Sequence, residues 1–244
     1  MNEVYTDNAE FPSINGKNLF SSPMDEIANT ITHGIGTLGA ITGLVFLCLK
    51  TAGFWNGSFF RPIDIVAGLI FTASMIGMFL VSTLYHASRH NRAKQILRKM
   101  DHAAIFIFIA GTYTPICLSG LGGGWGWSLF GLQWFLALCG IFLNSFGHTV
   151  LNSTLKLFFR RIELVVYLLM GWMIIIGFIP LFRSVPLPSV ILLLAGGIAY
   201  SIGTIFYKRK NIRLNHAVWH LFVILGAVCH WFSIWFLHSL SVPN

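Results

Sequence analysis

Seven stretches of this chain are almost continuously apolar, and each is close to the ~20 residues that a helix needs to cross a membrane. They lie at residues 31–49, 63–85, 103–118, 127–146, 164–182, 188–207 and 217–237. All are too long for strands and none alternates strictly between apolar and polar positions, so the pattern predicts helices. The connections are short. We therefore expect an all-α membrane protein in which residues 26–240 form a single seven-transmembrane helix bundle, preceded by a polar segment at residues 1–25.

The composition agrees with this pattern. Hydrophobic residues make up 55% and charged residues 10% of the 244 residues, with a mean hydropathy of +0.73, whereas soluble domains contain about 25% charged residues. The N-terminal segment has no apolar core followed by a cleavage site, so we expect no secretory signal peptide. The four cysteines lie within apolar stretches and form no C-x-x-C pair, which indicates small buried side chains rather than disulfides or metal ligands.

The positive charges predict the orientation of the bundle. Thirteen of the sixteen Lys and Arg residues lie in the N-terminal segment and in the second, fourth and sixth connections, and three lie on the other side. Because cytoplasmic connections are enriched in Lys and Arg, we expect the N-terminus in the cytoplasm and the C-terminus outside. The net charge of +8 is then explained by topology and by contacts with anionic lipid headgroups, and no nucleic-acid partner is expected.

Once this orientation is set, eight polar residues fall at one level near the cytoplasmic ends of four predicted helices. They are Glu26, Asn29 and His33 in the first helix, Ser82 and His86 in the second, Asp101 in the third, and His216 and His220 in the last. Polar side chains at membrane depth are costly and usually face the interior of a bundle with a paired or functional role. The convergence therefore indicates one polar site on the cytoplasmic side.

The spacing of these residues favours a shared site. His216 and His220 are four residues apart, and so are Ser82 and His86. Residues four apart lie on one face of a helix, and two histidines at this interval have a spacing that suits metal ligands. Each pair can therefore face the same point in the bundle.

Other polar residues nearby have a different interpretation. Asp101 and His102 differ by about 100° around a helix, so only one of them can face the interior. We choose Asp101 for the site and expect His102 to face a neighbouring helix or the headgroups. Four further histidines lie beside basic connections or far along the last helix, and we assign them no part in the site: His90, His148, His230 and His238.

A series of motifs runs through the chain in a fixed order: Glu26-x-x-Asn29-x-x-x-His33, Ser82-x-x-x-His86, Asp101-His102, Gly111-Thr112-Tyr113-Thr114-Pro115 and His216-x-x-x-His220. In this order the motifs resemble the progestin and adipoQ receptor family, and within it the bacterial hemolysin III branch. The similarity spans about residues 26–238. The chain lacks the long N-terminal extension of the animal receptors, so nothing about hormone recognition is carried over.

The resemblance implies a seven-helix fold in the bacterial cell membrane, with the N-terminus inside and a zinc ion held by three histidines. These histidines correspond to His86, His216 and His220. The acidic residue near the metal-bound water corresponds to Asp101, and the serine of the S-x-x-x-H motif to Ser82. The family includes members with amidase activity toward ceramide-like lipids.

Hydrolysis is the chemistry expected of such a site. Three protein ligands leave the fourth position of zinc open, as in catalytic sites, and bound water then has a pKa of about 7. Asp101 could act as general base, and Ser82 could hydrogen-bond the water or a developing oxyanion. We therefore expect a zinc-dependent hydrolase of lipid amides or esters, whose partners are membrane lipids and whose substrate enters from the inner leaflet.

Two other functions remain open. A pore-forming hemolysin, which causes cytolysis, needs polar residues along the depth of a helix, whereas the outer halves of the first, second, third and last predicted helices are almost wholly apolar and Gln133 is the main exception. A membrane-homeostasis or sensor protein could use zinc as a structural link between helices. For Glu26, Asn29 and His33 we expect either a supporting role beside the metal ligands or a role only in capping the first helix, and for Tyr113 either a supporting role beside the site or a role in the fold.

Overall fold

The computed structural model of the protein describes residues 22–54, 60–89, 91–150, 153–209 and 211–237. Within these residues all regular structure is helical, and seven segments are long and apolar enough to cross a membrane. The predicted seven-helix architecture is thus confirmed, and the chain is a multi-pass membrane protein. Most of the predicted polar segment at residues 1–25 lies outside the described residues, and its last three residues belong to the first helix.

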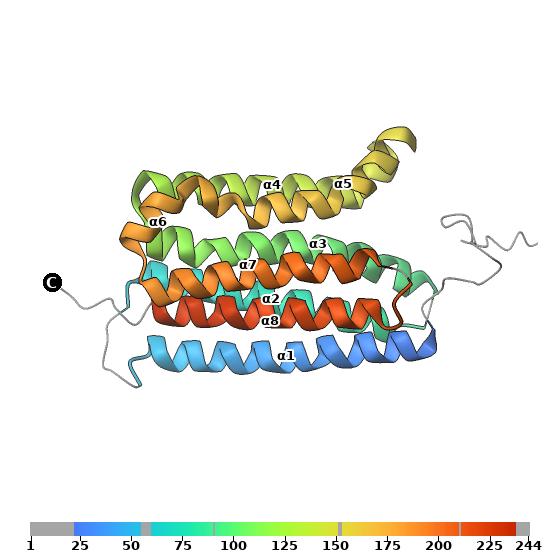
Figure 1. Ribbon diagram of the computed structural model, residues 1–244, viewed down its shortest axis with the longest axis horizontal. Helices are drawn as coiled ribbons and strands as arrows, with labels where there is room; N and C mark the ends of the chain where they lie inside the picture. Colours follow the sequence, from blue (N-terminus) through green and yellow to red (C-terminus); the bar gives the residue numbers. More distant parts are fainter. Residues whose placement is uncertain (1–21, 55–59, 90, 151–152, 210, 238–244) are drawn as a thin grey trace, which may run out of the picture.

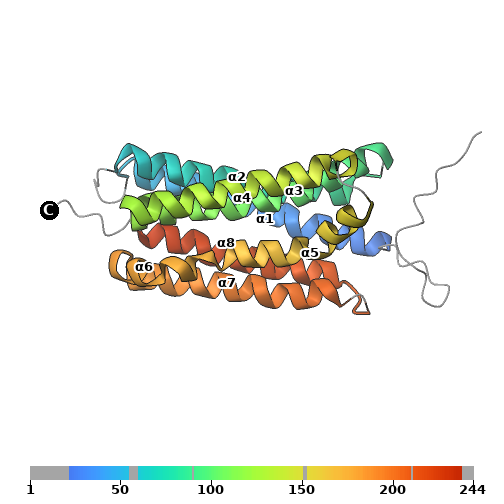
Figure 2. The same cartoon turned by 90° about the horizontal axis from the view of Figure 1, so that it is seen from above.

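The long helices lie side by side with their axes roughly parallel (Figure 1). In chain order the elements are α1 Pro23–Thr51, α2 Pro62–Ala87, α3 Asn91–Pro115, the π-helical turn η1 Ile116–Leu121, α4 Gly123–Val150, α5 Ser153–Gly171, the 3₁₀ turn η2 Met173–Gly177, α6 Phe178–Ser184, α7 Leu187–Lys208 and α8 Asn215–Leu237. With seven spans, the start of α1 and the end of α8 lie at opposite ends of the bundle (Figures 1 and 2). We call the end that holds the start of α1 the cytoplasmic end, as the distribution of Lys and Arg predicts.

The helices extend beyond the apolar stretches that predict them. The clearest case is α3, which begins at Asn91 instead of near residue 103. A helix satisfies its backbone hydrogen bonds internally, so helical structure can continue from the membrane into polar sequence, where hydropathy gives no signal. This extension brings Lys94 of α3 to the start of α1, where it pairs with Glu26.

The packing of the spans places four cytoplasmic helix ends next to one another. α3 is the most buried of the seven spans and contacts α2, α4 and α5. α1 contacts both α2 and α8, and α8 also packs along α7. The core between the helices is apolar, with Phe71 and Phe79 of α2 and Phe106 of α3 fully buried. The four helices that carry the predicted site residues therefore meet at one end of the bundle.

The first turn of α1 is capped by residues that lie outside the predicted site. The Ser22 hydroxyl accepts a hydrogen bond from the Asp25 N–H at 3.2 Å, and the Asp25 carboxylate accepts one from the Ser22 N–H at 2.8 Å. This reciprocal capping box satisfies N–H groups that have no partner within the helix. Glu26 is therefore not the cap of α1, and its carboxylate is directed to other residues.

The fifth span is interrupted between α5 and α6, so the stretch predicted at residues 164–182 is present but is not one continuous helix. Side chains bind the backbone groups that the break frees. Tyr113 donates to the Gly171 carbonyl and accepts from the Ile174 N–H, both at 2.8 Å, and Gln133 donates to the Met170 carbonyl at 2.7 Å. Breaks at membrane depth are tolerated where the protein satisfies the freed backbone in this way. Tyr113 and Gln133 thus serve the fold.

Polar side chains also link the helices at the outer end. Arg61 pairs with the buried carboxylate of Asp64 at 2.8 Å and donates to the Ser119 carbonyl at 3.3 Å. The hydrogen bond to Asp64 raises the pKa of Arg61 above its ordinary value. Lys50, also buried, donates to the Trp235 carbonyl and lies over the Trp235 ring. The charged side chains of Arg61, Asp64 and Lys50 are thus engaged in contacts within the bundle.

Candidate metal centre

Three imidazole rings meet at the cytoplasmic end, between α2 and α8. His86 lies in the last turn of α2, while His216 and His220 lie one turn apart at the start of α8. One ring nitrogen of each lies within 4.8 Å of the other two, and the ring centroids are 4.5 to 5.2 Å apart. We call these three residues the histidine group. The four-residue spacing on α8 explains why two of the rings reach the same point.

The outer nitrogens of two rings in this group are held by α1. His86 Nδ1 lies 2.7 Å from Glu26 Oε2. His220 Nδ1 lies 3.0 Å from Thr32 Oγ1, whose own proton is donated to a main-chain carbonyl of the preceding turn. Because the carboxylate and this hydroxyl oxygen both accept, both Nδ1 atoms carry the proton and both Nε2 atoms keep a free lone pair.

These lone pairs make the histidine group suited to a metal ion. The Nε2 atoms of His86 and His220 are buried and have no hydrogen-bond partner among the described residues. A buried acceptor left in this state costs about 1–3 kcal/mol, and a metal ion bound to the nitrogens removes that cost. Metal-bound histidines usually donate their other N–H to an oxygen atom that fixes the ring. The residues present therefore fit a divalent ion with three imidazole ligands.

Glu26 and Asn29 of α1 support His86 from the rim of the site. The second carboxylate oxygen of Glu26 lies 3.0 Å from Lys94 Nζ on α3, so this residue links α1 to both α2 and α3. Asn29 is 2% exposed and packs beside the same ring, with Nδ2 3.5 Å from His86 Nδ1, a contact between two donors that positions the ring without a hydrogen bond. The structure therefore places both residues beside the histidine group rather than in the cap of α1.

His33 lies against His220 instead of facing the point where the histidine group meets. The two rings are stacked, with centroids 3.4 Å apart and planes 14° apart. Phe79 meets His33 edge-on at 5.1 Å. Gly36 makes this packing possible, because a Cβ at that position would lie 2.8 Å from the Phe79 ring. The stacking holds the plane of the His220 ring.

Ser82 and Asp101 form the acidic side of the site. The Ser82 hydroxyl donates a hydrogen bond to the Asp101 carboxylate, which also interacts electrostatically with His86. This bond joins α2 to α3 one helical turn from His86, and Ser82 is 2% exposed. Asp101 therefore lies next to the histidine group without being one of its three converging residues.

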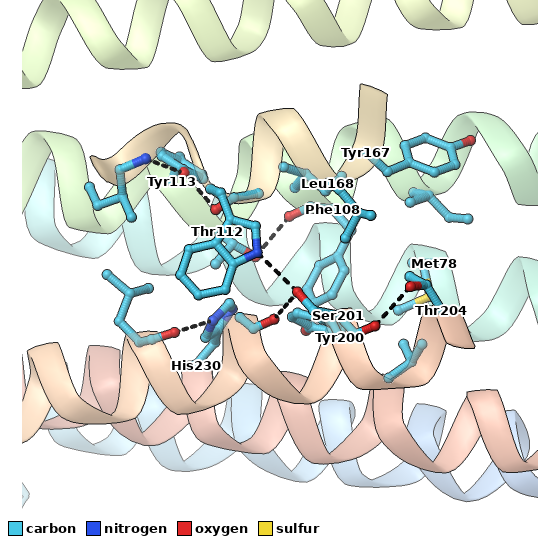
Figure 3. Close-up of a pocket in the computed structure, with 18 of the residues that line it drawn as sticks. Met78, Phe108, Thr112, Tyr113, Tyr167, Leu168, Tyr200, Ser201, Thr204 and His230 are labelled. Atoms are coloured by element: carbon cyan, nitrogen blue, oxygen red, sulfur yellow. Dashed lines mark hydrogen bonds between the residues drawn. The ribbon is translucent and has the colours of Figure 1, made fainter. Parts of the chain in front are cut away.

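A cavity of about 130 Å³ begins beside the histidine group, whose three rings are not part of its lining, and continues among α2, α3, α5, α7 and α8 (Figure 3). His33 and Asp101 line it close to the histidine group. His230 lines it deeper in the membrane, ten residues beyond His220 and thus about 15 Å farther along α8. Trp172, just after α5, forms part of the wall and donates to the Ser201 hydroxyl at 2.9 Å. Most of the other lining side chains are apolar.

A family model for haemolysin-III-related proteins matches residues 22–231 of this chain. The chain belongs to the haemolysin-III-related family. The Hemolysin-3 homolog of Bacillus subtilis (strain 168) is 44% identical over 221 residues, which cover 90% of this chain and 96% of that protein. Hemolysin-3 of Bacillus cereus is 38% identical over 215 residues, covering 87% and 91%.

The similarity of this haemolysin-III-related chain extends to animal proteins. The Monocyte to macrophage differentiation factor of Homo sapiens is 27% identical over 218 residues, which cover 86% of this chain and 83% of that protein. The resemblance to the progestin and adipoQ receptor family, in its hemolysin III branch, is confirmed. A multi-pass protein of this family fits a bacterial plasma membrane.

In this haemolysin-III-related bundle, the eight residues predicted at one level do lie together. They differ in position: three imidazoles converge, two residues of α1 support them, His33 stacks on one ring, and Ser82 and Asp101 lie alongside. Their roles as ligands and catalytic groups stay predictions. Tyr113 lies away from the histidine group, at the break after α5. Three histidines assigned no role fall where no side chain is described: His90, His148 and His238.

Sequence reasoning missed a second polar cluster in this haemolysin-III-related fold, formed around Glu163 of α5. The Glu163 carboxylate accepts hydrogen bonds from His102 at 3.1 Å, Asn144 at 3.1 Å and Tyr167 at 2.9 Å. We call these four residues the Glu163 cluster. It joins α3, α4 and α5, and it explains why His102 faces a neighbouring helix. The sequence does contain one indication of this cluster. Glu163 is an acidic residue at the start of an apolar stretch, and it lies four residues before Tyr167, on the same face of the helix.

Proposed function

We propose that this chain is a zinc-dependent hydrolase that cleaves the amide or ester bond of a membrane lipid at the cytoplasmic leaflet, as ceramidase-like enzymes do. One observation carries the proposal. The hydrogen-bonded pair Ser82 and Asp101 lies beside three converging histidine nitrogens, at the end of a largely apolar cavity. A metal ligand set, a candidate base and space for a lipid chain thus occur at one place.

Zinc is the metal that we assign to the histidine group. Neutral imidazole suits zinc, and three protein ligands leave one coordination position open, as in catalytic rather than structural zinc sites. Zinc bound there supplies Lewis acidity and lowers the pKa of water to about 7. His86, His216 and His220 would hold the ion, with Glu26 and Thr32 fixing the orientation of two of the rings.

The chain's own residues can then carry the proton transfers. Asp101 accepts the proton of the attacking water and delivers it to the leaving nitrogen or oxygen of the headgroup, while the Ser82 hydroxyl keeps the carboxylate in position. The water oxygen bonds to the lipid carbonyl carbon, and the bond to the headgroup breaks. The products are a fatty acid and a free amine or alcohol.

The cavity supports a lipid as the substrate. Its lining near the centre of the membrane is largely apolar, with side chains such as Phe108, Leu168 and Leu194. An acyl chain placed there brings its carbonyl carbon to Asp101 and His33, which line the same cavity at the level of the histidine group. The headgroup then lies at the cytoplasmic leaflet, where the basic connections are predicted to meet anionic lipids.

Asp101→Asn is the variant that tests this proposal, because it keeps the shape of the side chain and its ability to accept from Ser82. We expect zinc content to stay close to the wild-type level and the release of fatty acid to fall about 10²-fold or more, on the usual scale for a positioned acid–base group. The measurement is zinc content together with fatty acid release from a panel of amide- and ester-linked lipids. Zinc-loaded wild-type protein that releases nothing from the whole panel would reject the hydrolase.

A membrane-homeostasis or sensor role with structural zinc is the second candidate. The observation that favours it is that the histidine group joins α2 to α8 and is braced by Glu26 and Thr32 of α1. Zinc in that role ties three helices together and needs no turnover. Asp101→Asn would then change little beyond a modest loss of stability, while zinc removal would loosen the bundle.

Cytolysis, which the word hemolysin in the relatives' names suggests, has less support. A pore needs polar groups that face a continuous channel. Two charged side chains at the outer end are bonded within the protein: Lys50 to the Trp235 carbonyl and Asp64 to Arg61. Such groups stabilise helix packing, and they give no reason to place a channel through the outer half of the bundle.

A further inference from the structure

A second pair of polar rings lies in the cavity, well away from the histidine group. His230 of α8 and Tyr200 of α7 both line it (Figure 3). The two rings meet nearly at right angles, with centroids 5.3 Å apart. Other hydroxyl groups of the lining, those of Thr112 and Ser201, already donate to carbonyls of their own helices at 2.8 Å. His230 and Tyr200 differ from them in having polar atoms that the protein does not satisfy.

Two glycines make room for this pair of rings. His230 packs on Gly196 of α7, where a Cβ would come within 2.3 Å of ring atom Cδ2, and Tyr200 packs on Gly226 of α8, where a Cβ would come within 2.6 Å of Cζ. Each glycine lies four residues before the ring of its own helix, so α7 and α8 make the same contact reciprocally. Any larger residue at either position would displace a ring. The interface is therefore built around this pair.

Each ring carries one polar atom without a partner. His230 Nε2 lies 3.1 Å from the Leu193 carbonyl oxygen. A carbonyl can only accept, so Nε2 carries the proton and Nδ1 is left as an acceptor. His230 Nδ1 and the Tyr200 hydroxyl are both buried and have no hydrogen-bond partner among the described residues. Buried polar groups are costly in this state, and they are usually explained by a ligand or a water molecule.

We propose that the cavity binds a lipid chain that carries a hydroxyl group at this depth, where the hydroxyl donates to His230 Nδ1 and accepts from the Tyr200 hydroxyl. The inference rests on the proposed function, because it takes the carbonyl carbon of the chain to lie beside the histidine group. A hydroxyl matches the pair because it is both donor and acceptor. A methylene group satisfies neither atom, and a ketone satisfies only Tyr200.

The distance along α8 indicates where on the chain the hydroxyl lies. The ten residues from His220 to His230 span about 15 Å of helix. An extended chain advances roughly 1.2 Å per bond, as the dimensions of an extended backbone imply. About 12 bonds therefore separate the carbonyl carbon, C1, from the hydroxyl-bearing carbon, which places the hydroxyl at about C12 or C13. The ligand class is a long-chain fatty acyl group with a hydroxyl near its twelfth carbon.

Binding of free fatty acids to the full-length protein in lipid nanodiscs tests this proposal without requiring turnover. The probes are stearate, 12-hydroxystearate and 7-hydroxystearate, each measured by displacement of a fluorescent fatty acid. We expect 12-hydroxystearate to bind about tenfold more tightly than stearate, the effect of satisfying two buried partners. The 7-hydroxy isomer places its hydroxyl at the wrong depth and should show no such gain.

Two variants remove the polar atoms while keeping an aromatic ring, namely Tyr200→Phe and His230→Phe. Each should reduce the preference for 12-hydroxystearate to about threefold or less. Thr112→Val is the matched control, because Thr112 lines the same cavity but donates its hydroxyl proton to the Phe108 carbonyl at 2.8 Å. The control should keep the full preference. Tyr200→Phe is the decisive variant, since His230→Phe also removes the bond to Leu193.

The outcomes separate this inference from the hydrolase proposal. Equal affinity of the wild type for stearate and 12-hydroxystearate would overturn the inference and indicate that the two rings close on each other or on a water molecule. Failure of both acids to bind would also overturn it. A preference for 12-hydroxystearate in a protein that hydrolyses none of the lipid panel would keep the hydroxyl site and reject the hydrolase, and hydrolysis without the preference would do the reverse.

Discussion

The histidine group and the Glu163 cluster are two polar regions that lie on either side of the same turn of α3. Asp101 interacts with the first, and its neighbour His102 belongs to the second. In the Glu163 cluster one buried carboxylate accepts three hydrogen bonds from three side chains. In the histidine group, the inner nitrogens of His86 and His220 have no hydrogen-bond partner among the described residues.

This difference separates a ligand site from a structural link. In the Glu163 cluster both oxygens of the buried carboxylate have hydrogen-bond donors, as buried polar groups in native proteins generally do. Where acceptors converge without partners, something outside the chain is expected to bind them. The histidine group should therefore control metal content, and the Glu163 cluster should control stability. Three predictions test that contrast, from the largest expected effect to the smallest.

Replacing His220 by Ala should abolish stoichiometric zinc binding, because only two of the three ligands remain. Since a ligand that binds only the folded state stabilises it, the thermal midpoint should fall as well. The measurements are metal content after purification and thermal unfolding with and without a chelator. His230→Ala serves as the control: it should keep its zinc, although loss of the bond to Leu193 lowers its stability. Full zinc content in His220→Ala would show that this ring is no ligand.

Replacing Glu163 by Ala should destabilise the bundle by about 3 kcal/mol, since His102 and Asn144 lose their acceptor, while the Tyr167 hydroxyl can still donate to the His102 carbonyl at 2.9 Å. Zinc affinity should stay close to wild type, because α5 contributes nothing to the histidine group. Thermal unfolding and metal titration on the same preparation measure both effects. Glu163→Gln, which keeps an acceptor oxygen, should recover part of the stability. Loss of zinc from a Glu163→Ala protein of normal stability would contradict the division of roles.

Replacing Glu26 by Gln should weaken zinc binding by about 10- to 100-fold, the usual effect of changing an oxygen that orients a metal-bound histidine. A chelator competition assay measures this change. Asp25→Asn is the matched control on the neighbouring residue, because Asp25 caps α1 and does not reach His86. It should alter stability by about 1 kcal/mol or less and leave zinc affinity unchanged. Identical zinc affinities for the two variants would remove Glu26 from the site.

Hydropathy and charge were sufficient to predict the seven spans and the level of the site. The apolar runs are long, and lipid requires each of them to satisfy its own backbone, so the number of helices follows directly from the sequence. Polar residues in such runs are few, and the four-residue spacing of His216 and His220 fixes a common face. This is why residues from four helices could be assigned to one place.

Other features depend on contacts between segments that are far apart in the sequence. The break after α5 falls within an apolar stretch and depends on Tyr113 and Gln133, which belong to other helices. His230 was given no role because it lies far along α8 from the other predicted site residues. Its partner in the cavity is Tyr200 on α7. Periodicity within one helix carries no information on pairs of this kind.

The position of the three histidines along the chain also sets the order of events during synthesis. About 130 residues separate His86 from His216, and at roughly 5–20 residues per second a ribosome needs about 7–26 s to cover that interval. Until α8 is inserted, His86 of α2 is the only member of the histidine group in the bilayer. The three converging ring nitrogens are therefore not yet assembled. If the histidine group holds zinc as proposed, metal binding would therefore be a late step of biogenesis that requires the insertion of α8.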